Sequence, residues 1–164
     1  MMFKKICIIG CGLIGSSIAR AVKKNNLSEK VVSSNRSAEI NKKVIELKIV
    51  DESSSETEKM VSNSDLTIIA TPLSSYESVI LKIKSSLKIG SIITDVGSVK
   101  GGILNLIENH VPENVSWIPS HPIAGTEESG PEAGFSELFK NRWCILTPSK
   151  KAKEKDVNVL KVFW

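Results

Sequence analysis

Apolar and polar positions follow two different spacings in turn along this chain. Short continuous apolar runs, such as residues 6–9 and 66–70, have the length of strands that are buried on both faces. Between such runs, apolar residues return every three or four positions, as Ile14, Ile18 and Val22 do, which is typical of a helix with one buried face. The repeated alternation of strand and helix predicts an α/β domain with a doubly wound, mostly parallel sheet.

The same spacings set the bounds of the expected elements. Ser37 is placed to cap the second helix, and Ser55 with Glu58 has the spacing of a capping box for a further short helix. Residues 53–55 are expected to form a serine-rich connector. Strands are predicted at residues 5–9, 31–34, 66–70, 91–94, 115–118 and 143–147, and helices at residues 13–24, 37–47, 75–87, 100–109 and from 153 onward.

Composition narrows the class of protein. Of the 164 residues, 41% are hydrophobic and 24% are charged, as in soluble globular domains. No apolar run approaches the roughly 20 residues needed to cross a bilayer. Glycines interrupt the apolar stretch that follows the basic N-terminus, so no signal-peptide core is predicted. We therefore expect a cytoplasmic protein without a membrane partner.

Charge and cysteine content bear on two further kinds of site. The net charge of +4 is spread along the chain apart from a lysine cluster at 150–155, and only 5% of the residues are aromatic, so a nucleic-acid partner is not expected. Cys7, Cys11 and Cys144 are an odd number without a Cys-x-x-Cys pair. Neither a disulfide framework nor a metal site is predicted from them.

A glycine-rich turn between the first strand and the first helix carries the first chemical signal. The turn consists of Gly10, Cys11, Gly12, Leu13, Ile14 and Gly15. Its spacing matches the dinucleotide fingerprint, in which the first glycine permits the turn, the second lets backbone approach a pyrophosphate and the third lets the helix pack closely. We therefore predict a Rossmann-type dinucleotide-binding domain over residues 1–150. A glycine turn that serves packing alone is the alternative.

The residues after the second strand bear on which dinucleotide is bound. An acidic residue there would hydrogen-bond the free 2′-hydroxyl of NAD and repel a 2′-phosphate, but this chain has Asn35, Arg36 and Ser37. A guanidinium with neighbouring amide and hydroxyl groups suits a phosphate dianion. NADP is therefore favoured as the cofactor. In the alternative, Arg36 stacks on adenine and Asn35 binds the ribose of NAD.

Further polar residues follow two later strands, at the edge where open α/β sheets bind ligands. Thr71 and Pro72 end one of these strands and are expected to line the ribose or nicotinamide. Gly97, Ser98 and Lys100 follow the other and bring a hydroxyl and an ammonium group to the same crevice. Ser98 also has the place of a helix N-cap, which is compatible with a catalytic role.

A loop rich in glycine and proline, SHPIAGTEESGPEAG at residues 120–134, contains the most specific candidate. Loops of this kind commonly shape sites. Histidine accepts a proton near neutral pH, which a hydroxyl must lose as its carbon gives up hydride. We predict that His121 is a general base, with a structural role as the alternative. His110, beside Pro112, is assigned instead to the surface or to a helix end.

The glycine fingerprint and three other segments together resemble the prephenate and arogenate dehydrogenases of tyrosine biosynthesis. These segments are DVGSVKG at residues 95–101, HPIAGTEESG at 121–130 and RWCILTP at 142–148. The resemblance implies a small-molecule substrate, prephenate or arogenate. It also implies an oxidative decarboxylation that transfers hydride to NAD(P).

The resemblance further implies roles for individual residues. The histidine matching His121 takes the proton of the ring hydroxyl, while the serine matching Ser98 hydrogen-bonds that hydroxyl and orients the histidine. Thr126 and Glu127 match residues near the substrate entrance. Lys100 is a candidate for adding positive potential for a dianionic substrate, with a surface salt bridge as the alternative.

The chain departs from the resemblance in two places. Family members more often have an acid where Asn35 stands, which keeps NAD as the alternative cofactor. They also continue into a helical domain that forms a homodimer, whereas here that domain is apparently absent and residues 151–164 are expected to be its beginning. Leu160, Phe163 and Trp164 would then form an exposed apolar patch.

Two other functions stay open at this point. One is a non-catalytic or truncated NAD(P)-binding module. The other is a two-domain dehydrogenase of the 3-hydroxyacid type, which shares the fold but has no need of the loop around His121.

Overall fold

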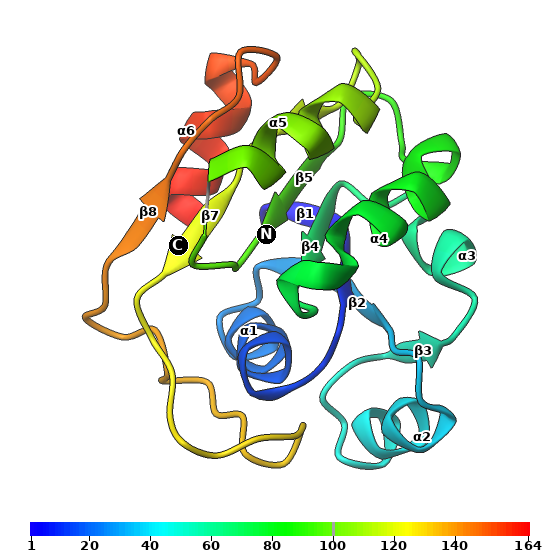
Figure 1. The fold of residues 1–164 in the computed structure, drawn as a ribbon. Coiled ribbons are helices and arrows are strands. Elements are labelled where there is room, and N and C mark those ends of the chain that lie inside the picture. Colours follow the sequence, from blue (N-terminus) through cyan, green and yellow to red (C-terminus); the bar gives the residue numbers. More distant parts are fainter. Residues whose placement is uncertain (100) are drawn as a thin grey trace.

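A parallel sheet of six strands forms the centre of the molecule (Figure 1). The computed structural model describes residues 1–99 and 101–164. The strand order is β3-β2-β1-β4-β5-β6, and every pairing within this sheet is parallel. This order confirms the predicted α/β fold with a doubly wound sheet of the Rossmann type. The strands are β1 (Phe3–Ile9), β2 (Ser28–Ser34), β3 (Glu52–Ser54), β4 (Leu66–Ile69), β5 (Ile92–Asp95) and β6 (Ser116–Trp117).

Helices cover both faces of the sheet (Figure 1). The first face carries α1 (Leu13–Lys24), α2 (Ala38–Glu46) and α6 (Glu154–Phe163). The second face carries α3 (Thr57–Val61), α4 (Tyr76–Ile83) and α5 (Gly101–His110). Short 3₁₀ turns flank α4 at Leu73–Ser75 and Lys84–Ser86. Two further strands, β7 (Ser120–Pro122) and β8 (Cys144–Leu146), pair with each other in an antiparallel ladder outside the main sheet.

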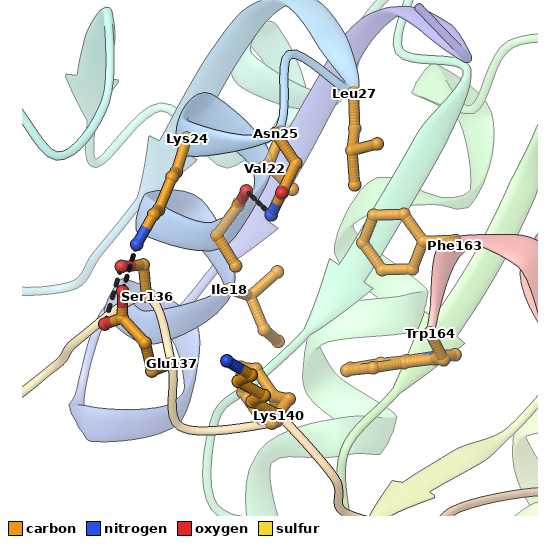
Figure 2. Close-up of a pocket in the computed structure, with 12 residues that line it drawn as sticks. Ile18, Val22, Lys24, Asn25, Leu27, Ser136, Glu137, Lys140, Phe163 and Trp164 are labelled. Atoms are coloured by element: carbon orange, nitrogen blue, oxygen red, sulfur yellow. Dashed lines mark hydrogen bonds and ion pairs between the residues drawn. The ribbon is translucent and has the colours of Figure 1, made fainter.

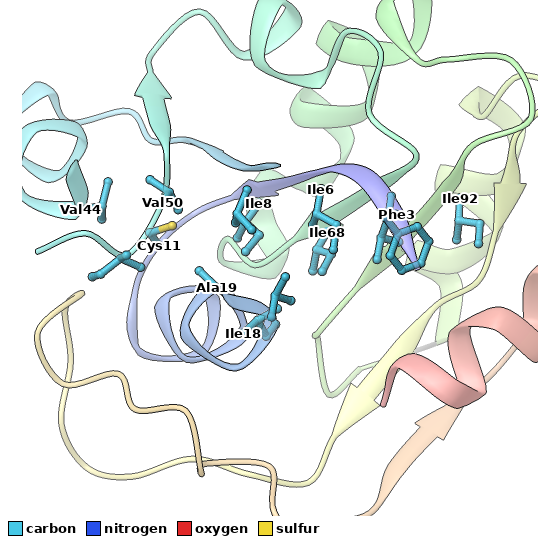
Figure 3. Close-up of a cluster of buried hydrophobic side chains, with 14 of the residues drawn as sticks. Phe3, Ile6, Ile8, Cys11, Ile18, Ala19, Val44, Val50, Ile68 and Ile92 are labelled. Carbon is cyan, nitrogen blue, oxygen red and sulfur yellow. The ribbon is translucent and has the colours of Figure 1, made fainter. Parts of the chain in front are cut away.

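The two cores follow from the alternation of side chains along each buried strand. In β1, Ile6 and Ile8 pack into the core under α1, as Figure 3 shows, while Cys7 and Ile9 point into the core on the opposite face. All four side chains are 4% exposed or less. A continuous apolar run is therefore needed here, because successive residues of a strand face opposite sides.

The order of the strands determines where ligands can bind. Strand β1 lies between β2 and β4, so the direction of sheet growth reverses at this point. Open α/β sheets bind ligands in the crevice beyond the carboxyl ends of the strands at such a reversal. The segments that follow β1, β2, β4 and β5 all lie at this carboxyl edge, and they contain most of the predicted site residues.

One of the two predicted helix caps is present in the structure and the other is not. The Ser37 hydroxyl accepts a hydrogen bond from the Ile40 amide at 3.3 Å, which confirms the cap of α2. The predicted capping box of Ser55 and Glu58 is wrong, because Glu56 occupies the cap position of α3 and makes no side-chain cap bond. Ser55 is bound differently, through its carbonyl, which accepts a hydrogen bond from the amide of Thr57.

Two polar segments form strands where loops were expected. Residues 53–55 were predicted as a serine connector, but Ser53 and Ser54 pair with β2 as part of β3. The Ser33 and Ser53 hydroxyls lie 2.7 Å apart across this pair. Residues 120–122 form β7 through pairing with β8. Neither segment has the apolar pattern from which a strand would be predicted. Both are strands because they pair with a partner strand, not because their own side chains are buried.

The C-terminal helix α6 packs onto the first core. Leu160 is fully buried, and the ring of Phe163 meets that of Phe3 edge to face at 6.0 Å between centroids. Trp164 makes a similar contact with Phe139 at 5.6 Å. The expected exposed patch of Leu160, Phe163 and Trp164 is therefore wrong, because these side chains cover the edge of the sheet core. The assignment of residues 151–164 to a second domain stays a prediction.

Asp65 ties strands together at the amino edge of the sheet, opposite the site. Its Oδ2 accepts hydrogen bonds from the amides of Lys4 at 2.7 Å and Lys5 at 3.2 Å, and its Oδ1 lies 2.5 Å from Lys88 Nζ. Burial acts to raise the pKa of Asp65, but the hydrogen bonds from Lys88 and the two amides outweigh it and hold this pKa below its ordinary value. The ionised carboxylate therefore stabilises the folded state.

We predict that Asp65→Asn lowers the free energy of unfolding at neutral pH by about 1–2 kcal/mol, because charge-assisted hydrogen bonds are lost. Since the pKa of Asp65 is lowered on folding, its contribution is complete above the ordinary carboxylate pKa of about 4 and fades as the pH falls below it. The two proteins should therefore converge in acid. Urea unfolding at several pH values measures this, and a difference that persists unchanged to about pH 2 would contradict it.

Candidate dinucleotide site and catalytic loops

A cleft of about 620 Å³ opens at the carboxyl ends of β1, β2 and β4. The predicted cofactor residues that line it follow these three strands. They are Gly10, Cys11, Gly12, Asn35, Arg36, Ser37, Thr71 and Pro72. The structure therefore brings together the glycine turn, the end of the second strand and the end of the fourth. Four predicted cofactor residues are not among the lining residues. Leu13 and Ile14 lie half-buried and Gly15 lies buried at the start of α1, and Gly97 lies beyond β5.

The three glycines of the turn meet different constraints. Gly10 has φ +94°, and a Cβ there would lie 2.8 Å from the Ala70 carbonyl oxygen. A Cβ on Gly15 would lie 2.0 Å from the carbonyl oxygen of Gly10, so α1 approaches β1 only without a side chain. A Cβ on Gly12 would meet nothing within 4 Å. The space at Gly12 is the space that backbone approach to a pyrophosphate requires.

The beginning of α1 is suited to an anion. Gly12 is its N-cap and offers no side-chain cap bond, and the first turn contains no acidic residue. The first amides of a helix have no partner within the helix, and the helix dipole makes this end positive. A phosphate group at the cleft would therefore be held by backbone amides.

The side chain of Asn35 is hydrogen-bonded to the backbone of the glycine turn. Its Oδ1 accepts the Cys11 amide at 2.6 Å, and its Nδ2 donates to Asn41 Oδ1 at 3.0 Å. Asn41 Nδ2 donates in return to the Asn35 carbonyl at 2.9 Å, and Ser53 donates to Asn41 Oδ1 at 2.6 Å. Asn35 is only 7% exposed. Its side chain is thus held by this network, and it acts on the site through the position of Cys11.

Two cations line the cleft, Arg36 after β2 and Lys82 on α4, and Lys82 is paired with Glu58. Arg36 and Lys82 are both exposed and line it, and its lining residues include no acid among the residues that the structure describes. Lys82 lies 3.4 Å from Glu58 and 3.5 Å from the Thr57 hydroxyl. Lys82, Thr57 and Asn41 were not predicted as site residues. Helix periodicity identifies buried apolar positions, whereas these polar residues reach the site only because separate elements pack together.

The two predicted catalytic residues lie beyond β5. Ser98 is exposed on the turn after this strand, and His121 is half-buried in β7. The turn and the strand are joined through Asp95, whose carboxylate accepts the Gly97 amide at 2.9 Å and the Ser120 amide at 3.1 Å. Gly97 and Ser120, which immediately precede Ser98 and His121, are thus both hydrogen-bonded to the carboxylate of Asp95.

The outer face of β7 and β8 is apolar around the histidine. His121 stands opposite Ile145 in the antiparallel ladder, and Ile123 donates its amide to the Trp143 carbonyl. Residues two apart in a strand share a face, so these side chains flank His121. Ile123, Ile145 and Trp143 are 44%, 52% and 84% exposed. An apolar ring bound next to His121 would find favourable contacts here.

The remaining predicted substrate residues lie on or near the glycine-rich loop. Thr126 and Glu127 are exposed, and the Thr126 hydroxyl accepts the Glu128 amide at 3.2 Å. The loop continues to α1, where a Cβ on Gly134 would lie 2.1 Å from Ser16 Oγ, so only glycine allows this contact. Lys100 lies outside the described residues.

A second cleft, of about 490 Å³, lies between α1, residues 136–140 and the end of α6. Figure 2 shows Ile18 and Val22 facing Phe163 and Trp164 across it, with Lys24 paired to Glu137 at its rim. None of the predicted site residues lines this cleft. It is therefore separate from the dinucleotide site.

Cys7 and Cys11 are buried and are not placed for reactivity. Burial raises the pKa of Cys7 to about 12 and that of Cys11 to about 11, so both thiols stay protonated near neutral pH. The described residues contain no cluster of three metal-ligating side chains. Within the same part of the chain, no helix has the length and apolar character that a membrane crossing needs.

Comparison with known proteins identifies the family. Residues 18–164 match the family described as "Prephenate dehydrogenase, nucleotide-binding domain". The chain belongs to the prephenate dehydrogenase family.

Individual relatives agree with the family match. The chain is 34% identical to the cyclohexadienyl dehydrogenase of Zymomonas mobilis over 99% of its own length and 55% of that protein. It is 32% identical to the prephenate dehydrogenase of Bacillus subtilis over 95% of its length and 42% of that protein. A crystal structure of prephenate dehydrogenase from A. aeolicus, in complex with hydroxyphenyl propionate and NAD+, matches with a TM-score of 0.90 at 29% identity, covering 98% of this chain and 56% of that one. The chain thus spans about half the length of the relatives it matches.

We predict that Gly12→Val abolishes dinucleotide binding and leaves the domain folded. A Cβ at Gly12 would meet nothing within 4 Å, so we expect a side chain there to fit the fold and to fill the space needed by the pyrophosphate. Calorimetric titration with NAD and NADP, together with thermal unfolding, measures both properties. Gly10→Ala is the contrasting variant, because its Cβ would clash with Ala70 and should lower stability as well. A folded Gly12→Val protein with wild-type affinity would place the pyrophosphate elsewhere.

Proposed function

We propose that the protein carrying this chain is an NAD(P)-dependent prephenate or arogenate dehydrogenase. The observation that carries the proposal is the link through Asp95 between the turn of Ser98 and the strand of His121, beyond the same sheet edge as the dinucleotide cleft. Membership of the family and the names of its relatives support it. The reaction is an oxidative decarboxylation of a cyclohexadienol ring.

The residues of the site divide the reaction between them. The nicotinamide, when bound, accepts the hydride that leaves the hydroxyl-bearing ring carbon. His121 takes the hydroxyl proton, and Ser98 hydrogen-bonds the same oxygen and orients the histidine. The ring carboxylate departs as CO₂, its bonding electrons complete the aromatic ring, and the resulting phenolate oxygen takes the proton back from His121. The product is 4-hydroxyphenylpyruvate from prephenate, or tyrosine from arogenate.

The chain's own residues fit a dinucleotide. The open space at Gly12 and the uncapped start of α1 suit the pyrophosphate, while Thr71 and Pro72 line the route towards the nicotinamide. Arg36 and Ser37 stand where the adenosine ribose would lie. Because Arg36 lies at this end of the cleft and none of the described lining residues is acidic, we infer that NADP is preferred over NAD. Arg36 stacking on adenine in an NAD complex is the alternative.

Other parts of the proposal concern the whole protein. Thr126 and Glu127 are proposed to lie near the substrate entrance, and Lys100 to raise the positive potential there. We infer that residues 151–164 lead into a helical domain and that the full-length protein is a homodimer, as the resemblance implies. An odd number of cysteines without a Cys-x-x-Cys pair supports a reducing compartment such as the cytoplasm.

The cofactor preference is tested on the chain itself. Arg36→Ala should weaken NADP binding about 10- to 100-fold and leave NAD binding nearly unchanged, because one charge-assisted hydrogen bond to phosphate is lost. Titration calorimetry with both dinucleotides measures the change. Lys42→Ala is the matched control, since it removes an exposed cation of α2 that does not line the cleft. Equal wild-type affinities, or equal losses for both dinucleotides, would favour the stacking role.

The reaction is tested in the full-length protein with prephenate and arogenate. Wild type should reduce NAD(P) with at least one of them, and His121→Asn should bind the dinucleotide normally and turn over about 10² to 10⁴ times more slowly. His110→Asn, the matched control at the end of α5, should stay near wild type. Wild-type protein that oxidises neither substrate would overturn the proposed function, and an active His121→Asn would remove the histidine from the mechanism.

A further inference from the structure

Asp95 is a fully buried acidic residue at the last position of β5. Its Oδ2 accepts the Gly97 amide at 2.9 Å, and its Oδ1 accepts the Ser120 amide at 3.1 Å. Gly97 immediately precedes Ser98, and Ser120 immediately precedes His121. The two oxygens of one carboxylate therefore hold two segments that are more than 20 residues apart in the chain.

The strand that carries His121 depends on these bonds for its place. Strand β7 pairs with β8 and is not a member of the main sheet. Ser120 links it to the sheet, since its hydroxyl donates to the Asp95 carbonyl at 2.5 Å and lies 3.0 Å from the Thr94 hydroxyl. The end of β5 thus holds β7 through side chains where a backbone ladder is lacking.

The turn that carries Ser98 lies directly on the same carboxylate. A Cβ on Gly97 would lie 3.0 Å from both Asp95 Oδ2 and the Tyr76 hydroxyl. Tyr76 is fully buried in α4, and burial together with the Asp95 charge raises the pKa of its hydroxyl, which keeps it a proton donor. The floor under the turn is therefore closely packed, and no side chain fits at Gly97.

We propose that Asp95 is a positioning residue, whose carboxylate sets the turn of Ser98 and the strand of His121 in a fixed relation to each other. This inference rests on the proposed function for its catalytic consequence. A hydroxyl and a base act on one substrate oxygen only when both are placed to within a fraction of an ångström, and a misplacement of about 1 Å costs about 100-fold in rate. Buried charge-assisted hydrogen bonds are short and directional, which suits this task.

The decisive variant is Asp95→Asn, which keeps the size of the side chain and replaces one acceptor oxygen with a donor. One of the two amides then faces an NH₂ group and loses its bond. In the full-length protein, kcat should fall about 10- to 100-fold, while the KM for the dinucleotide changes less than about twofold. Hydrogen exchange at Gly97 or Ser120 should become about tenfold faster or more.

Asp65→Asn is the matched control for a general loss of stability. Asp65 also accepts two backbone amides with its carboxylate, but at the opposite edge of the sheet. This variant should lower stability and leave kcat and the exchange of Gly97 and Ser120 unchanged. Exchange of amides in β1 reports the stability loss in both variants.

Gly97→Ala keeps the test decisive where Asp95→Asn does not fold. Its methyl group would push the turn away from Asp95 and Tyr76 from a half-buried position, and it should lower kcat in the same way. Retention of wild-type kcat by the folded variants, or unchanged exchange at both amides, would overturn the positioning role. Wild-type protein without dehydrogenase activity overturns the proposed function instead, and the exchange measurement then decides alone whether Asp95 holds the two segments.

Discussion

Close backbone contact at the end of β1 is the constraint on which the dinucleotide site depends. Gly10 lies against the Ala70 carbonyl, and Gly15 lies against Gly10 itself, so that β1, β4 and α1 meet with no side chain between them. Because of this contact, the N-terminus of α1 points to the crevice between β1 and β4, where the order of strand addition reverses. The open space at Gly12 and the positive end of the helix are consequences of the same approach.

Two buried polar networks hold the segments that surround this contact. Asn35, Asn41 and Ser53 support the glycine turn through the Cys11 amide, and Asp95 supports the segments beyond β5. Each network provides hydrogen-bond acceptors for backbone amides that would otherwise lack partners. A buried amide without a partner would cost about 1–3 kcal/mol of stability. Both networks therefore stabilise the fold and determine the geometry of the site with the same hydrogen bonds.

The surroundings of the two halves of the site differ in character. The dinucleotide cleft combines apolar side chains with the backbone of the glycine turn, several hydroxyls and two cations, and the last three suit phosphate and ribose. The face around His121 is apolar and exposed, with Ile123, Ile145 and Trp143 beside the histidine. The two surfaces therefore differ in chemistry, and one lies on the main sheet while the other lies on the antiparallel pair.

The sequence alone predicted the buried strands of the parallel sheet, the glycine turn and the class of cofactor, because each of these depends on a local pattern. Continuous apolar runs specify strands buried on two faces, and the glycine spacing specifies a turn that only glycine can make. The family was recognisable from four short segments, since these carry the turn, the strand ends and the histidine loop. Serine-rich β3 and polar β7 were missed, because a partner strand rather than their own pattern makes them strands.

Only the tertiary structure decided which polar residues act together. Asn41, Lys82 and Asp95 have no distinguishing pattern in the chain, and each reaches the site through packing of elements far apart in sequence. The same is true of Leu160 and Phe163, whose apolar character predicted an exposed patch until the sheet core supplied their partners. Hydrophobic periodicity reports whether a residue is buried, but the identity of its neighbours depends on how the layers close around the sheet.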